Sequence, residues 1–149
     1  MADNEKNFSA EEREAMKEAA ADKRKARSRS KKTPEEIRAE GVADLEAAIA
    51  KLPDGKDRQL SKALHELVTE VAPELMPRTY YGMPAWGKDG KVLCFFQPAS
   101  KFKVRYGTFG FEPISNLDDG TMWPTAYALL ELTAANRTKL AERIRLAAS

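Results

Sequence analysis

The segment from Tyr80 to Phe96 constrains the fold more than any other part of this chain. Aromatic and β-branched residues lie on both sides of Lys88-Asp89-Gly90, and an Asp-Gly pair readily adopts the positive φ angles of a tight hairpin turn. We therefore predict an antiparallel hairpin that pairs residues 79–86 with residues 91–97. This hairpin sets the fold class, because it requires an antiparallel sheet.

Helical patterns lie on both sides of the strand region. Residues 33–36, Thr-Pro-Glu-Glu, form an N-terminal capping signal, and apolar residues then recur every three or four positions over 34–52. A second apolar stripe covers 57–71 and ends before a proline. A last helix is predicted over 133–148, with a threonine as its N-cap.

Four segments have the residue pattern of strands, namely 78–86, 91–97, 102–106 and 121–129. The stretch from Thr108 to Pro113 has the composition of turns and loops, as does the run Asp118-Asp119-Gly120. Together these patterns predict an α+β domain in which helices pack on one face of an antiparallel four-stranded sheet.

The first 32 residues differ from the rest of the chain. Ser9 and Glu12 form a capping box, and strong helix formers follow to about Arg27, but the apolar stripe is narrow. We therefore divide the chain into an N-terminal extension, residues 1–32, that is helical or mobile, and a folded domain, residues 33–149. Removal of the extension is expected to cost the domain less than about 1 kcal/mol.

Charge is unevenly distributed within the extension. Residues 1–22 carry three basic and seven acidic side chains, whereas residues 23–32 carry seven basic and no acidic ones. Such a block can contact nucleic-acid phosphates. The alternative is a solvated linker, since the block has no aromatic residue for stacking on bases. We call it the basic segment, and its charged residues are Lys23, Arg24, Lys25, Arg27, Arg29, Lys31 and Lys32.

Motifs for catalysis are missing from the sequence. The one histidine and the one cysteine, His65 and Cys94, cannot form a zinc site of the usual kind. His65 lies at the flank of an apolar helix stripe, and Cys94 lies within a strand pattern, where it is expected to pack in the core. No Walker A loop, G-x-S-x-G elbow or glycine-rich dinucleotide motif occurs. A binding function is therefore favoured over catalysis.

Acidic residues gather on the first helix of the domain. Glu36, Glu40 and Asp44 follow one another at spacings of four and share one helix face, with Glu35 close by. We call the first three residues the acidic ridge. Exposed carboxylates suit hard or borderline cations such as ferrous or ferric iron, held loosely. The alternative is a solvated helix face whose carboxylates favour the helix dipole.

The chain has more aromatic residues than one sheet face needs. Tyr81, Trp86 and Trp123 are the candidates for lining a small-molecule cleft, and a two-sided core is the other explanation for them.

Three segments resemble the YdhG-like domain family, namely Tyr81-Gly82-Met83-Pro84-Ala85-Trp86, the strand Val92 to Phe96 with Lys101-Phe102 after it, and Trp123-Pro124 before the final helix. The resemblance covers about residues 34–148. Residues 1–32 have no counterpart in the short members, and residues 103–111 are longer and more basic than theirs. Some members are described as frataxin-like intracellular iron chaperones. The resemblance therefore implies iron as the bound metal and iron-accepting proteins as partners, but it assigns iron to none of the motif residues.

The first residues are polar and acidic, with no apolar segment behind them. This pattern predicts no secretory signal and no membrane association, and hence a cytoplasmic location. Three functions follow as hypotheses: iron binding and delivery at the acidic ridge, nucleic-acid association through the basic segment, and small-molecule binding in an aromatic cleft.

Overall fold

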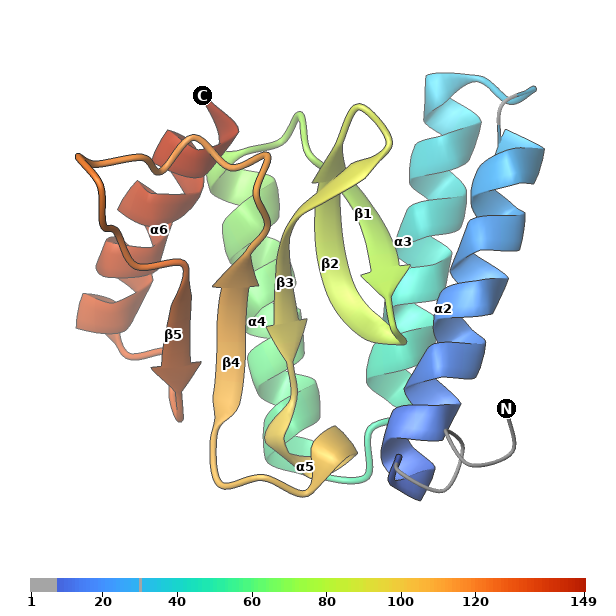
Figure 1. Ribbon diagram of the computed structural model, residues 1–149, viewed down its shortest axis with the longest axis horizontal. Coiled ribbons are helices and arrows are strands. Elements are labelled where there is room, and N and C mark those ends of the chain that lie inside the picture. The colour runs from blue at the N-terminus through green and yellow to red at the C-terminus, as the bar shows by residue number, and fades with distance from the viewer. Residues whose placement is uncertain (1–7, 30) are drawn as a thin grey trace.

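The computed structural model describes residues 8–29 and 31–149. It has an α+β fold in which five antiparallel strands form one sheet in the order β1-β2-β3-β4-β5. Helices α3, α4 and α6 pack against one face of this sheet, and α2 lies alongside α3 at the β1 edge (Figure 1). None of the described helices is long and apolar enough to cross a membrane.

The long helices lie where the sequence predicts them. Three of their N-caps are as expected, because the hydroxyls of Ser9, Thr33 and Thr133 accept hydrogen bonds from the backbone N–H three residues later. The four helices are α2 (Ala10–Arg29), α3 (Pro34–Ala50), α4 (Gly55–Val71) and α6 (Ala134–Ala148).

The predicted hairpin is confirmed for its central part. Strand β2 (Met83–Lys88) pairs antiparallel with β3 (Lys91–Gln97), and the connecting residues Asp89 and Gly90 have φ angles of 52° and 78°. This is the left-handed conformation that a two-residue hairpin turn requires.

One strand more is present than the sequence predicts. The segment 78–86, predicted as a single strand, folds into the end of β1 (Met76–Tyr80), a turn, and the start of β2. Tyr81 and Gly82 form this turn with φ angles of 52° and 74°. A tyrosine rarely adopts a positive φ angle, so the turn has no clear signal in the sequence.

The prediction of a strand over residues 102–106 is wrong. Its place is taken by α5 (Ala99–Phe102) and a turn, and β4 (Gly107–Phe111) lies in the stretch predicted as a loop. The two glycines of β4 are needed because the rings of β3 cross them: a Cβ on Gly107 would lie 2.7 Å from the Phe96 ring. Strand β5 (Ala126–Leu129) is shorter than predicted.

The core lies between the sheet and the three helices on its face. Its largest fully buried side chains include Trp86, Phe96 and Phe109 from the sheet, and Leu45 and Ile144 from the helices. Cys94 is also fully buried, and burial raises the pKa of its thiol far above the ordinary value. The thiol is therefore a packing group and not a nucleophile.

Candidate functional site

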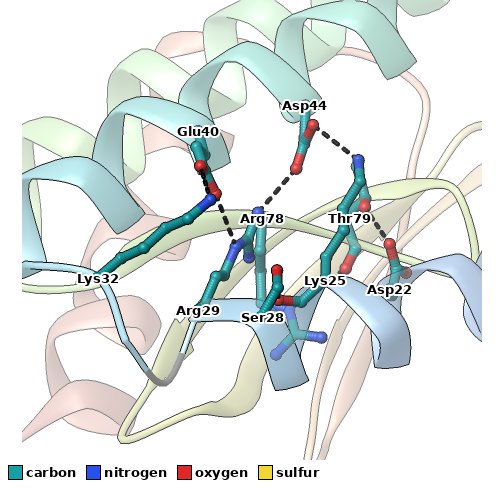
Figure 2. Close-up of polar contacts among 9 residues, drawn as sticks. All are labelled: Asp22, Lys25, Ser28, Arg29, Lys32, Glu40, Asp44, Arg78 and Thr79. Carbon is teal, nitrogen blue, oxygen red and sulfur yellow. Dashed lines mark hydrogen bonds and ion pairs between the residues drawn. The ribbon is translucent and has the colours of Figure 1, made fainter.

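The structure brings the two charged features of the sequence together. Three residues of the basic segment, Lys25, Arg29 and Lys32, lie against two carboxylates of the acidic ridge on α3 (Figure 2). At the centre of the contact is the guanidinium of Arg29, which donates to Asp44 Oδ2 at 2.7 Å and to Glu40 Oε2 at 3.5 Å. Two carboxylates on successive turns of α3 thus lie on either side of one cationic group.

Two further cations complete this contact. Lys25 Nζ lies 2.8 Å from Asp44 Oδ1, and Lys32 pairs with Glu40. The contact is partly desolvated, because the side chain of Arg29 is only 16% exposed and that of Asp44 only 22%. The hydrogen bond from Lys32 lowers the pKa of Glu40. Glu40 is therefore held in the charged form that a cation needs.

A partly buried polar contact fixes α2 to the edge strand β1 beside the ridge. Thr79 Oγ1 donates to Asp22 Oδ1 at 2.6 Å (Figure 2), whereas Asp22 Oδ2 is buried with no hydrogen-bond partner among the described residues. Burial raises the pKa of Asp22 and lowers the pKa of the neighbouring Arg78. Desolvation therefore disfavours the charged form of the Asp22 carboxyl, whereas the guanidinium of Arg78 stays protonated.

The first half of α2 contacts the turn before β2, helix α5 and the residue just after α5. Glu18 pairs with Lys101 at 3.0 Å, and Glu11 pairs with Lys103 at 2.7 Å. Glu18 also lies directly over Gly82, where a Cβ atom would meet its Oε2 at 1.4 Å. Helix α2 therefore covers Gly82 in the turn between β1 and β2, which belongs to the segment that carries the family resemblance.

Sequence reasoning missed this docking face of α2. Its inward charges, Glu11, Glu18, Asp22, Lys25 and Arg29, follow one another at spacings of seven, four, three and four. Such spacings place side chains on one helix face. The periodic signal is therefore present, but it is carried by charges and not by apolar residues.

The remaining residues of the basic segment lie elsewhere on α2 or after it. Lys23, Arg24 and Arg27 are exposed on the helix, and Lys31 is exposed just beyond it. Arg24 and Arg27 share the outward face of α2 with Arg13 and Lys17. Along the chain these four residues are separated by four, seven and three positions, which places them on one side of the helix. The extension thus has one charged face docked on the domain and a second, basic face open to solvent.

The aromatic residues of the predicted cleft do not come together around open space. Trp86 is fully buried, and its Nε1 donates to His65 Nδ1 at 3.2 Å. Met83 and Pro84 are buried with it, whereas Tyr81 is 39% exposed in its turn. Trp123 is half-buried against the core, and Pro124 is exposed.

Within the described part of the chain, no group of three or more histidine, cysteine, aspartate or glutamate side chains is placed to hold a metal ion. Glu36 is exposed one turn before Glu40, and its backbone N–H is used by the Thr33 cap. The ridge therefore offers two convergent carboxylates, Glu40 and Asp44, rather than three.

Comparison with protein-family models, with curated proteins and with solved structures found no match. The resemblance to the YdhG-like family thus stays a prediction from the sequence.

Proposed function

We propose that the acidic ridge of α3 binds a metal cation loosely for delivery, and that ferrous iron is this cation. The choice of iron comes from the family resemblance. The observation that supports a cation surface is the position of Arg29, whose guanidinium lies between Glu40 and Asp44. The same two carboxylates can accept another cation in its place.

Exchange between Arg29 and the cation explains how such a surface would load and unload. A cation that enters must displace the guanidinium, and two carboxylates leave most of its coordination shell to water. Binding is therefore weak, and return of Arg29 favours release. Glu36 lies one turn away and adds negative charge to attract the cation.

Titration of the purified protein with ferrous iron under anaerobic conditions tests this proposal. Replacement of the ridge by Glu36→Gln, Glu40→Gln and Asp44→Asn is expected to weaken binding at least about tenfold, since it removes the ligand charges. The matched control is Glu46→Gln, Glu66→Gln and Asp119→Asn, which removes the same charge from exposed sites elsewhere. Equal affinity in the ridge variant would reject this site.

The outward face of α2 favours nucleic-acid association as a second candidate function. Arg13, Lys17 and Arg24 are exposed and make no ion pair with any described residue. They lie on one face of a helix of 20 residues, so they can contact phosphates while the opposite face stays docked. The domain itself adds little, because residues 33–149 carry 15 basic and 16 acidic side chains.

Duplex DNA binding measured against salt concentration tests this second candidate. The slope of log affinity against log salt is expected to be near −3 in the parent, about 0.9 for each phosphate contacted. In the variant Arg13→Gln, Lys17→Gln and Arg24→Gln the slope should become less negative by about 0.9 for each side chain removed. Replacement of the exposed Lys56, Lys62 and Lys91 by glutamine is the control. Identical slopes in both variants would exclude the outward face.

A further inference from the structure

Strand β5 and helix α6 lie at the end of the molecule away from α2 (Figure 1). Residues of these two elements border an open cleft. Its volume is about 580 Å³. The cleft is lined by the buried side chains of Leu129 and Leu140 and by the exposed Leu130. Two hydrogen bonds fix the loop between β5 and α6, from the backbone N–H of Asn136 to Thr133 Oγ1 and from Asn136 Nδ2 to the Glu131 carbonyl. The cleft is thus formed by regular elements and capped loops.

Two pairs of a cation and an aromatic ring line this cleft. Arg105 lies over the ring of Tyr106, with Cζ 5.1 Å from the ring centroid. Lys139 lies over the ring of Tyr127, with Nζ at 5.6 Å. The pairs come from the loop before β4, from β5 and from α6. The tertiary fold therefore gathers basic and aromatic groups that are up to 34 residues apart in the sequence (139 − 105).

The two cations of the cleft have no carboxylate partner in the described part of the chain. Arg105 and Lys139 are both exposed, and neither takes part in an ion pair, unlike Arg29 or Lys101. Among the described residues, Glu131 is the one acidic residue that lines the cleft. Two positive charges beside one negative charge leave the cleft suited to an anion.

The rings give the cleft a second preference. Tyr106 is 38% exposed, and Tyr127 packs against the core on one side while facing the cleft on another. Exposed tyrosine and arginine planes are the groups on which nucleic-acid bases stack. An anion without an aromatic ring would contact only the basic side chains, and a neutral aromatic ligand would contact only the tyrosine rings. A ligand with both a ring and a negative charge would use both.

We propose that the β5–α6 cleft binds a nucleoside phosphate, with the base stacked on the tyrosines and the phosphate held by Arg105 and Lys139. Two sources provide this chemistry: a free nucleotide, or one nucleotide unit of a single strand. The proposal is independent of the acidic ridge, which lies at the opposite end of the molecule (Figure 1).

Titration of the full-length, isotope-labelled protein with adenosine monophosphate, followed by nuclear magnetic resonance, tests the proposal. The shifts should be centred on Tyr106, Tyr127 and Lys139. Adenosine and inorganic phosphate should each bind at least about tenfold more weakly than the nucleotide, because each lacks one of the two contacts. Phosphate that binds as tightly as the nucleotide would overturn the base contact. No shift in the cleft with either the nucleotide or a short single-stranded oligonucleotide would overturn the site.

Variants separate the two contacts. Arg105→Gln with Lys139→Gln should weaken nucleotide binding at least about tenfold, whereas Lys62→Gln with Lys91→Gln, which removes the same charge elsewhere, should leave it unchanged. Tyr106→Phe keeps the ring and should bind as the parent does, and Tyr106→Ala should not. Equal binding by the alanine and phenylalanine variants would contradict stacking.

The oligonucleotide identifies the source. If a single strand binds at least about tenfold more tightly than the mononucleotide, the cleft serves nucleic acid, since neighbouring units add contacts. If the single strand and the mononucleotide have the same affinity per nucleotide, the ligand is a free nucleotide. Either result supports the nucleoside phosphate as the ligand class.

Discussion

At the scale of single residues, the hydrogen bond between Trp86 and His65 defines a protonation state. Trp86 Nε1 can only donate, so His65 Nδ1 must accept and the imidazole must be neutral. Burial also lowers the pKa of His65. The sequence places His65 at the flank of an apolar stripe, and the half-buried position agrees with that. Its partner could not be predicted, because Trp86 lies 21 residues away on a strand.

This bond predicts a loss of stability in mild acid. Because the folded-state pKa of His65 lies below the unfolded value, its contribution is complete above about pH 6.5 and is lost as the pH falls through the folded pKa. Replacement His65→Leu leaves the buried Trp86 N–H without an acceptor and should cost about 1–3 kcal/mol near neutral pH.

Urea unfolding of both proteins at about pH 7.5 and about pH 5.5 measures the effect. The difference in unfolding free energy between parent and variant should shrink at the lower pH. A difference that is the same at both values would show that His65 does not titrate in the predicted way.

At the scale of elements, α3 approaches β1 closely at a glycine. A Cβ atom on Gly41 would lie 1.9 Å from the carbonyl oxygen of Pro77. A Gly→Ala change in a helix ordinarily stabilises by about 1 kcal/mol. Gly41→Ala should instead destabilise by at least about 2 kcal/mol, because helix and strand must separate. The matched variant Ala43→Gly, at an exposed site of the same helix, should cost only about 1 kcal/mol. Thermal unfolding in which the Gly41 variant matches the parent would contradict this packing.

Helix α2 is held mainly by charge. Six ion pairs join α2 and Lys32 to the rest of the domain, whereas Ala15 is its one buried residue among those described. Ion pairs near the surface contribute roughly 0–1 kcal/mol each and are screened by salt. The small loss of unfolding free energy expected on removal of the extension stays a prediction. Because salt screens these ion pairs, the loss should be larger at low ionic strength.

Amide hydrogen exchange of the full chain measures this attachment. Between about 0.05 M and 1 M sodium chloride, protection of α2 should fall while protection of α3 and α4 stays constant, because screening weakens only the docking contacts. Protection of α2 that does not change with salt would show that apolar packing holds the helix.

At the scale of the whole molecule, short-range sequence signals were sufficient to predict part of the fold. Capping residues and the Asp89-Gly90 turn act within a few positions, so the helices and the hairpin could be predicted. Gly107 and Gly110 have the composition of a loop, and only the rings of β3 explain their place in a strand. The contact of the basic segment with the acidic ridge was missed for a similar reason, since it depends on two helices lying side by side.

The central claim is that the basic segment and a metal cation compete for Glu40 and Asp44. The most direct test compares ferrous iron binding by the parent with that of Lys25→Gln, Arg29→Gln and Lys32→Gln. The matched control is Lys23→Gln, Arg24→Gln and Lys31→Gln, which removes the same charge from exposed sites of the same segment. Removal of the paired cations should tighten binding at least about tenfold relative to the control, because the carboxylates are released. Equal affinity in the two variants, or no iron binding by any of the proteins, would contradict the account.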